Sequence, residues 1–399
     1  MNDSDYRWVD DPSVDVWSSG EIAVAWVDQS RKDIFFQRYG RDGARRFEEP
    51  TGVSRNPDTF SWLPRVVVNP DEPNQVHVLW QEIVFSGGSH GGEIFFASSS
   101  DAGRTFSQPA NLSHSTAGDG KGRLDRAIWD NGSLDLARGS SGELFAAWTE
   151  YEGTLWFRRS TDGGKSFSTA LRISGSDDAP ARGPSLAVSG STVHLAWAVG
   201  ENRAADIQFA SSKDRGASFG PVRAVCESRG HSDAPKIATH SEGTVHLAYA
   251  EGPEGPGKAY HIRYSRLPPD AARFEAPRKV AGSEGGHGAS AHYPQLAVDR
   301  EGAVFLLWEK YAEPQARPRE LAFTYSRDRG EHFQAPSILA DISANALGFN
   351  GGQQGLLMKK LAVGQAGIVA IVNSTFRPDE ASHVWLLRGR LQQDRSSAD

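Results

Sequence analysis

Pro184-Ser-Leu-Ala-Val188 opens the most informative stretch of the chain, which continues through Val193-His-Leu-Ala-Trp197 and Ile207-Gln-Phe-Ala210 to Ser212-Lys-Asp-Arg-Gly-Ala-Ser-Phe219. It reads as an apolar strand, a glycine turn, an alternating strand that ends in Trp, an aromatic strand, and a polar turn closed by Phe. Alternation of this kind is typical of strands with one buried face. Because no window longer than about ten residues shows the 3.6-residue period of a helix, the sequence predicts an all-β protein.

The same pattern recurs seven times. The closing Phe returns at intervals of 52 to 61 residues, at Phe47, Phe106, Phe167, Phe219, Phe274 and Phe333. The aromatic residue that ends the second strand returns as Trp26, Trp80, Trp148, Trp197, Tyr249 and Trp308, with Val372 in the last copy. Each interval holds four ordinary strands with their turns, which is the content of one propeller blade. We therefore predict one β-propeller with seven blades of four antiparallel strands, and six blades as the alternative.

The ends of the chain bear on how the ring closes, since a propeller leaves only short edges whereas a solenoid needs capping ends. The predicted blades span roughly residues 13–55, 61–113, 131–175, 182–226, 232–282, 291–341 and 355–391. The last copy lacks a fourth strand, and an unassigned segment at 6–9 precedes the first copy. We expect that segment to complete the last blade within a single domain, 1–391, followed by a polar tail at 392–399.

Composition excludes several classes of protein. The chain has 399 residues, with 43 Lys and Arg against 50 Asp and Glu, so its net charge of −7 without a basic run argues against nucleic acid as the main partner. Its 11 Trp, 19 Phe and 9 Tyr exclude disorder, because so much aromatic surface must be buried. The apolar runs are too short to span a membrane. Cys226 is the only cysteine, so an intrachain disulfide is excluded.

No phosphate loop, dinucleotide fingerprint or His-Glu-x-x-His motif occurs, so we expect neither a cofactor nor a metal. The first residues contain neither a basic nor an apolar leader region. We therefore expect a cytoplasmic protein by default, or a secreted one if a leader has been removed. The oligomeric state is left open.

Four of the polar turns share one consensus, with Ser, Asp, Gly and Phe at fixed positions: Ser99–Phe106, Ser160–Phe167, Ser212–Phe219 and Ser326–Phe333. In such a turn Asp binds backbone N–H groups, Gly accepts a positive φ, and the aromatic ring covers the turn. These turns are Asp boxes, and over roughly residues 13–390 the chain resembles the sialidase (neuraminidase) superfamily with its bacterial neuraminidase repeats. The resemblance implies that the boxes lie on the face away from the active site and serve the fold.

If the boxes join the third and fourth strands, the residues that open the first strand of each blade face the other end of the channel. Aligned on the strands, these residues are Ser13, Arg65, Asp135, Ser185, Lys236, Gln295 and Lys360. All seven are polar, which suits either a polar ligand at the channel mouth or a water-filled channel. For Arg65 and Lys236 we favour binding of a ligand over contact with water in the channel.

The resemblance also implies site residues. A sialidase holds the substrate carboxylate with three Arg and uses a Tyr nucleophile and an acid/base Asp. By resemblance Arg65 stands for the first Arg, Asp130 for the acid/base and Tyr293 for the nucleophile, with Arg126 and Arg182 as candidates for the other two Arg. Carboxylates also recur at the ends of second strands, at Asp28, Glu82, Glu150 and Glu251. Because they recur, we expect them to serve the blades.

We predict a carbohydrate-active enzyme, a sialidase-like glycoside hydrolase, with one site at the channel mouth opposite the boxes. Its predicted catalytic residues are Asp130, Tyr293 and His231. Its predicted substrate-binding residues are Arg65, Arg126, Asp135, Arg182, Lys236, His292, Gln295 and Lys360. One alternative is a polysaccharide lyase for a uronate glycan, with His231, His292 or Tyr293 as base and a nearby cation as neutraliser of the carboxylate. Another is a non-catalytic glycan binder, although such a protein would repeat its binding residues from blade to blade.

Overall fold

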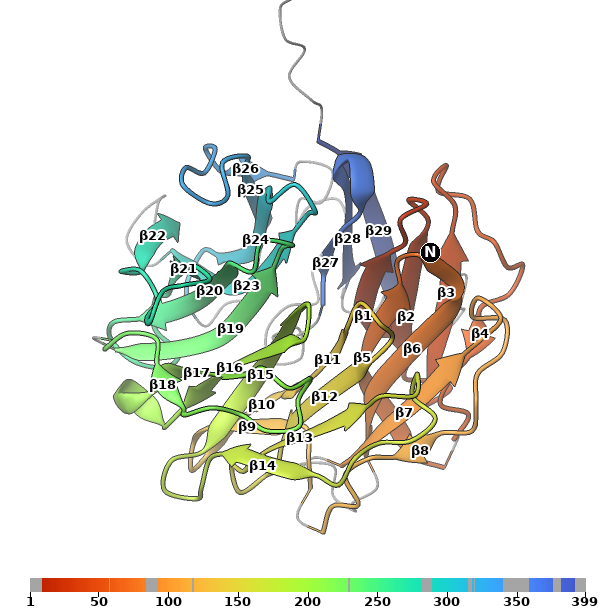
Figure 1. The fold of residues 1–399 in the computed structure, drawn as a ribbon, viewed down its shortest axis with the longest axis horizontal. Coiled ribbons are helices and arrows are strands. Elements are labelled where there is room, and N and C mark those ends of the chain that lie inside the picture. Colours follow the sequence, from red (N-terminus) through yellow and green to blue (C-terminus); the bar gives the residue numbers. More distant parts are fainter. Residues whose placement is uncertain are drawn as a thin grey trace, which may run out of the picture.

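The computed structural model describes residues 9–56, 58–83, 92–116, 118–228, 230–281, 289–314, 318, 320–339, 359–375 and 382–391. Seven antiparallel sheets stand around a common centre, so the all-β, seven-bladed propeller is confirmed (Figure 1). Within these residues the only helical segments are two 3-10 turns, at Asn202–Ala204 and Gln365–Gly367. No helix in the described ranges has the length and apolar character needed to cross a membrane.

In each blade the strands run in sequence order from the centre outward. Blade 1 contains β1 (Val9–Val16), β2 (Ile22–Asp28), β3 (Asp33–Tyr39) and β4 (Thr51–Gly52). Blade 2 contains β5 (Phe60–Asn69), β6 (Glu72–Ile83), β7 (Glu93–Ser99) and β8 (Ala110–Asn111). Blade 3 contains β11 (Leu134–Arg138), β12 (Leu144–Thr149), β13 (Leu155–Ser160) and β14 (Leu171–Ser174). A separate hairpin, β9 (Lys121–Asp125) and β10 (Ile128–Asn131), is inserted before it.

The remaining blades follow the same order. Blade 4 contains β15 (Ala181–Ser189), β16 (Thr192–Val199), β17 (Asp206–Ser212) and β18 (Arg223–Ala224). Blade 5 contains β19 (His231–Thr239), β20 (Val245–Gly252), β21 (His261–Leu267) and β22 (Arg278–Ala281). Blade 6 contains β23 (Ser290–Val298), β24 (Val304–Tyr311), β25 (Glu320–Ser326) and β26 (Ser337–Ile338). Blade 7 has three described strands, β27 (Leu361–Val363), β28 (Ile368–Thr375) and β29 (His383–Arg390).

Blades 7 and 1 meet directly. The N–H of Val14 in β1 donates to the carbonyl of Lys359 at 3.0 Å, and the N–H of Val9 donates to the Ser382 hydroxyl at 2.5 Å. Val9 itself pairs with Asp28 in blade 1. The rest of the segment predicted to complete blade 7, residues 6–8, lies outside the described residues, as does the predicted tail. That part of the ring-closure hypothesis therefore stays a prediction.

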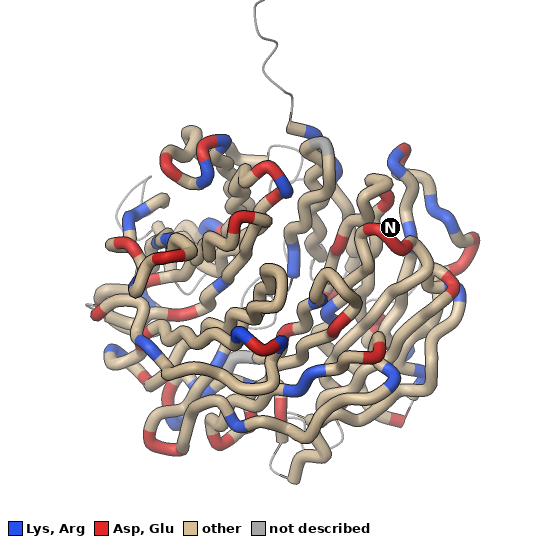
Figure 2. Tube along the Cα trace, in the orientation of Figure 1, with Lys and Arg blue, Asp and Glu red and all other residues tan. Residues whose placement is uncertain are grey.

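The core lies between the blades. A cluster of buried apolar side chains fills each of the seven junctions between neighbouring blades, including the junction of blades 7 and 1. Trp80, Trp148, Trp197 and Trp308, which end the second strands, are almost fully buried in these junctions. The recurring aromatic residue is therefore explained by packing of one blade on the next. Acidic and basic residues are interspersed along the outer turns (Figure 2).

The four polar turns join the third and fourth strands, as predicted. In the turn of blade 3, Asp162 accepts the N–H of Ser166 at 2.9 Å, and the Ser160 hydroxyl donates to Asp162 at 2.7 Å. Gly164 has φ +87°, and a Cβ there would lie 2.7 Å from the ring of Phe96 in the preceding blade. Glycine is thus required both by the backbone and by the contact between blades.

Candidate functional site

Five inner strands carry the same irregularity near their N-terminal ends. Each shows a register shift where a residue of positive φ precedes a proline. These residues are Asp11 (φ 49°), Leu63 (φ 58°), Gly183 (φ 59°), Ala234 (φ 50°) and Tyr293 (φ 54°). A bulge bends the strand and redirects the side chains on one side of it. Because it recurs, the bulge belongs to the fold, and the repeated residue-Pro pairs in the sequence are a signal for it that our sequence analysis missed.

The predicted ring of polar residues falls into two groups. The first group holds neighbouring blades together, because a side-chain oxygen accepts a backbone N–H of the next inner strand. The pairs are Ser13 with Val66 (3.0 Å), Asp135 with Leu186 (2.8 Å), Ser185 with Ile237 (3.1 Å) and Gln295 with Lys360 (3.1 Å). For Asp135 and Gln295, two of the predicted substrate-binding residues, the structure thus shows a contact between blades.

The second group consists of the cations Arg65, Lys236 and Lys360, whose residues are 0%, 8% and 2% exposed. Arg65 donates to the carbonyls of Pro64 and Gly132, at 3.1 and 3.2 Å, and burial lowers its pKa to about 10. Burial likewise lowers the pKa of Lys236 to about 8. Lys360 forms an ion pair with Glu309. These three charges therefore lie inside the ring, beneath the mouth.

Four other predicted site residues come together at the N-terminal ends of the inner strands of blades 4, 5 and 6. We define the arginine–histidine cluster as Arg182, His231, Asp233, His292 and Tyr293. Nε of Arg182 donates to Asp233 at 3.0 Å, and Nη2 lies 3.1 Å from Nε2 of His231. The rings of His292 and Tyr293 stack with centroids 3.6 Å apart. The cluster thus joins three blades at one point.

Arg182 is the structural centre of this cluster. Its N–H groups meet the Asp233 carboxylate, the His231 ring and the carbonyls of Gly200, Ser232 and Arg123. Since a guanidinium has five N–H donors, Arg182 has none left over for a ligand. Because Nη2 of Arg182 is a donor, Nε2 of His231 accepts, and Nδ1 of His231 carries the hydrogen towards the carbonyl of Asn202, 2.5 Å away.

Burial and charge set the protonation of the other members. Burial raises the pKa of Asp233, but the charge of the Arg182 guanidinium outweighs it, so that this pKa is lower than its usual value. Burial lowers the pKa of His292 to about 3, which makes the imidazole neutral at pH 7. Nε2 of His292 is buried and has no hydrogen-bond partner among the described residues.

Aromatic stacking holds His292 and Tyr293 in place. The His292 ring lies between Tyr260, with centroids 3.9 Å apart and planes 9° apart, and Tyr293. Tyr293 is half-buried, belongs to the bulge of β23 and packs on Ala234 of the neighbouring blade. It is the most exposed member of the cluster.

The inserted hairpin lies against the cluster. A Cβ at Gly122 would lie 2.4 Å from Cβ of Arg182, so the two chains are in close contact. Arg123 forms ion pairs with Asp177, in the connection between blades 3 and 4, and with Glu201 in blade 4. The exposed Arg126 lies in the turn between β9 and β10.

Asp130, the predicted acid/base, belongs to β10 and pairs with Gly122. Its side chain lies outside the described part of the chain, so its prediction rests on the resemblance.

The recurring carboxylates at the ends of second strands have partners within the blades, as expected. Glu82 accepts from the Trp80 indole and the Ser61 hydroxyl, both at 2.7 Å, and Glu251 forms an ion pair with Arg263 at 2.6 Å. Asp119 differs from these carboxylates. It is 2% exposed, and burial raises its pKa to about 8. No group of three or more His, Cys, Asp or Glu side chains in the described ranges is arranged to hold a metal.

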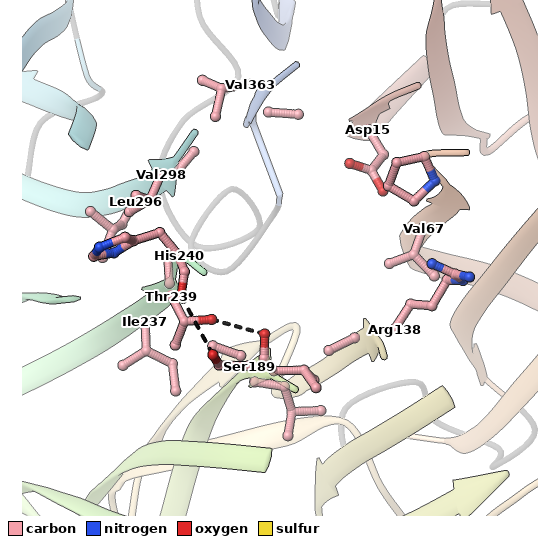
Figure 3. A pocket seen from close by; sticks show the side chains of 18 of the residues that line it. Asp15, Val67, Arg138, Ser189, Ile237, Thr239, His240, Leu296, Val298 and Val363 are labelled. Atoms are coloured by element: carbon pink, nitrogen blue, oxygen red, sulfur yellow. Dashed lines mark hydrogen bonds between the residues drawn. The ribbon is translucent and has the colours of Figure 1, made fainter. Parts of the chain in front are cut away.

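A cavity of about 710 Å³ occupies the other end of the channel, among the C-terminal halves of the inner strands (Figure 3). Its inner end includes Asp135, Lys236 and Gln295, and its outer end includes Arg138 and His240. The polar turns follow third strands, which run parallel to the first strands, so the cavity and the turns share one face of the ring. The arginine–histidine cluster lies at the opposite end.

Comparison with known proteins shows the fold. No protein-family model matches the chain, and no curated protein matches it. An ulvan lyase of polysaccharide lyase family 25, solved with -[GlcA(1-4)Rha3S]-, is 12% identical with a TM-score of 0.54, covering 96% of this chain and 94% of the lyase.

An α-L-arabinanase from Penicillium chrysogenum, in complex with arabinobiose, is 12% identical with a TM-score of 0.53 (83% and 93% covered). NanB sialidase from Streptococcus pneumoniae is 11% identical with a TM-score of 0.50 (77% and 66% covered). At these identities the likeness concerns the propeller itself.

Proposed function

We propose that the chain is a carbohydrate-active enzyme that cleaves an acidic polysaccharide by β-elimination at the arginine–histidine cluster. The observation that carries the proposal is the convergence of Arg182, His231, His292 and Tyr293 from three different blades. The lyase, the arabinanase and the sialidase that share the fold are all described as acting on glycans, which supports the substrate class.

β-Elimination requires few catalytic groups. A base removes the proton on the carbon next to the uronate carboxylate, the carbon–oxygen bond at the β position breaks, and the leaving oxygen takes up a proton. The electron pair of the C–H bond becomes the new double bond. An enzyme must therefore transfer protons and stabilise the charge that develops on the carboxylate. In our proposal Tyr293 acts as its phenolate: it removes the proton on the carbon and then returns it, as the phenol, to the leaving oxygen. The neutral imidazole of His292 lies on the carboxylate side.

Arg182, His231 and Asp233 act as positioning residues in this proposal. The donors of Arg182 are all used within the protein, and His231 is fully buried with both ring nitrogens in contact. A fixed frame of this kind holds catalytic groups in one geometry and avoids reorganisation during the reaction. The buried cations Arg65 and Lys236 add positive charge beneath the mouth, which favours an anionic substrate, whereas the charge of Lys360 is balanced by Glu309.

Hydrolysis of a glycoside, the sialidase-like activity expected from the sequence, is the second candidate. It requires a carboxylic acid that keeps its proton near neutral pH. Asp119 favours this candidate, because burial raises its pKa to about 8. The carboxylates at the ends of second strands do not, because they are held by partners within the blades.

The test is a panel of uronate-containing polysaccharides and chromogenic glycosides given to the purified protein. Elimination produces both new reducing ends and the ultraviolet absorbance of an unsaturated uronate, whereas hydrolysis produces reducing ends alone. Binding of a glycan without either signal would identify a non-catalytic binder and overturn the proposal.

Two variants locate the site. Tyr293→Phe removes the proton-transferring hydroxyl and keeps the ring stack, so kcat should fall by about 100-fold or more. Tyr325→Phe is the matched control, since Tyr325 is also half-buried but lies in β25, away from the cluster. Arg65→Ala should weaken substrate binding. Unchanged turnover in both Tyr293→Phe and Arg65→Ala would refute the assignment of the site.

A further inference from the structure

The cavity at the end of the channel opposite the arginine–histidine cluster is lined by side chains that could hold a small molecule. Its wall combines aliphatic side chains, among them Val67, Ile237, Leu296 and Val298, with a few polar groups (Figure 3). A volume of about 710 Å³ lies within the usual range for binding sites of small organic molecules. The wall therefore suits a ligand with an apolar body.

The carboxylates of this cavity already have donors. Asp15 accepts the N–H of Val68 at 2.9 Å and lies 3.5 Å from Nζ of Lys359. The Asp135 carboxylate accepts backbone N–H groups, Asp71 binds the Ser18 hydroxyl, and Asp299 accepts the N–H of Ala303. A cationic ligand would have to compete with these contacts.

The guanidinium of Arg138 is in the opposite state, whereas Lys359 and Arg300 form ion pairs with Asp15 and Asp71. Arg138 lines the cavity from blade 3, and no described residue forms a hydrogen bond or ion pair with its guanidinium, whose Nε is buried. Burial lowers the pKa of Arg138, and the nearby carboxylates of Glu72, Asp71, Glu143 and Asp15 offset this only in part. On another side of the cavity, the side chain of His240 is 2% exposed, and its Nε2 lies 3.9 Å from the Glu242 carboxylate. Buried polar atoms without partners are rare in folded proteins and point to a missing acceptor.

A chain of contacts orients His240. The Tyr264 hydroxyl lies 2.6 Å from Nδ1 of His246, and Nε2 of His246 lies 3.3 Å from Nδ1 of His240. When Tyr264 donates along this chain, Nδ1 of His240 accepts, and Nε2 of the neutral ring then carries a hydrogen. Nε2–H of His240 is thus directed towards Glu242, and Arg138 is the side chain that offers N–H donors to the cavity.

We propose that this cavity binds an organic carboxylate with an aliphatic body, whose carboxylate pairs with Arg138 and whose body lies on Leu296, Val298 and Ile237. The site lies at the other end of the channel from the arginine–histidine cluster and does not depend on the reaction proposed there.

The test is isothermal titration calorimetry of the full chain with octanoate, and with octanamide as the uncharged probe. Wild-type protein should bind octanoate saturably and octanamide at least tenfold more weakly. Arg138→Gln should weaken octanoate binding at least tenfold, since a hydrogen-bonded charge pair is lost. Arg273→Gln, at an exposed position outside the cavity, is the matched control and should bind octanoate like the wild type.

Ala238→Phe supplies a second variant, because Ala238 lines the cavity, is half-buried and belongs to none of the core clusters of the described residues. The added ring should abolish binding of both probes while circular dichroism remains that of the folded protein. Absence of saturable octanoate binding by the wild type, or equal affinity of wild type and Arg138→Gln, overturns the proposal. Arg138→Gln should keep the turnover of the wild type, so the outcome is independent of the proposed reaction.

Discussion

The polar turns and the arginine–histidine cluster use similar residues in different ways. In the turns of blades 2, 3, 4 and 6, the Asp accepts the backbone N–H four residues later and the hydroxyl of the Ser two residues earlier, so all four turns have the same hydrogen bonds. In the cluster, Arg182, Asp233 and His292 occupy comparable places on three inner strands and are chemically different. A residue that recurs in every blade stabilises the blade, whereas residues that differ at comparable places are free to form one site.

The polar residues of the inner strands support this distinction. Ser13 and Ser185 make the same hydrogen bond to the next blade, and Asp135 and Gln295 make it with other side chains. Polarity along the channel therefore reports contact between blades as well as ligand binding. The cluster differs because it combines an ion pair, two histidines and a bulged tyrosine in one place.

Replacement of Arg182 by methionine should have the largest effect on stability. Arg182 and Asp233 are 1% and 5% exposed as side chains, so the substitution leaves a buried carboxylate without its partner. The free energy of unfolding should fall by about 3 to 5 kcal/mol, measured by urea denaturation.

The control is Arg329→Met, which breaks the exposed ion pair with Glu242 and should cost at most about 1 kcal/mol. The double variant Arg182→Met/Asp233→Leu removes both charges and should recover most of the loss. If Arg182→Met and Arg329→Met were equally stable, the ion pair of Arg182 with Asp233 would not be a buried one, which would contradict this prediction.

The buried histidines of the second strands predict how stability depends on pH. His77, His194 and His246 follow the same valine in three blades, and burial lowers their pKa values to about 4, 4 and 3. A histidine whose pKa is lower in the folded than in the unfolded chain contributes stability above its unfolded pKa of about 6.5, and that contribution is lost as the pH falls. Acidification from neutral pH should therefore destabilise the protein.

His77 allows a clean measurement, because neither ring nitrogen has a hydrogen-bond partner among the described residues. In His77→Leu, the slope of unfolding free energy against pH should decrease by about 1.4 kcal/mol per pH unit between about pH 6 and 4.5. Val222→Ala, at an exposed position without a titratable group, should leave the slope unchanged. Turnover on polysaccharide should stay as in the wild type, since His77 belongs to the repeated scaffold. An unchanged slope in His77→Leu would contradict this account.

Local pattern was enough to predict the blades. The strand-ending Trp, the glycine turn and the polar turn each follow from a few neighbouring residues, and their period gave seven blades. The placement of the polar turns between third and fourth strands followed from the same pattern. These features are fixed by alternation and turn chemistry, which a sequence displays directly.

The contacts within the site could not be predicted from local sequence patterns, because they join residues that are far apart in the chain. Arg182, His231 and His292 could be suggested as candidates, but their contact depends on the bulge before Pro184, Pro235 and Pro294 and on the stagger of neighbouring blades. The saturation of Arg182 by three carbonyls could not be predicted, because those carbonyls belong to β9, to the turn after β16 and to β19. The cavity with Arg138 was also missed, since its residues lie at the ends of inner strands that looked structural.

The smallest expected effect concerns a single turn. Asp162 accepts the N–H and hydroxyl of Ser166, which together with Ser160 lower its pKa to about 2. Asp162→Ala removes these hydrogen bonds from an exposed turn and should lower the free energy of unfolding by about 1 kcal/mol at pH 7. Asp178→Ala, at another exposed Asp, is the control and should be neutral.

The pH dependence of the stability difference between wild type and Asp162→Ala identifies the cause of that difference. Because the folded pKa of Asp162 is lower than the unfolded one, its stabilisation is complete above about pH 4 and is lost as the pH falls towards about 2. Wild type and Asp162→Ala should therefore converge in stability on acidification, at unchanged turnover at neutral pH. A loss of turnover in Asp162→Ala without a loss of stability would mean that a repeated turn takes part in the reaction, and the separation between scaffold and site residues would fail.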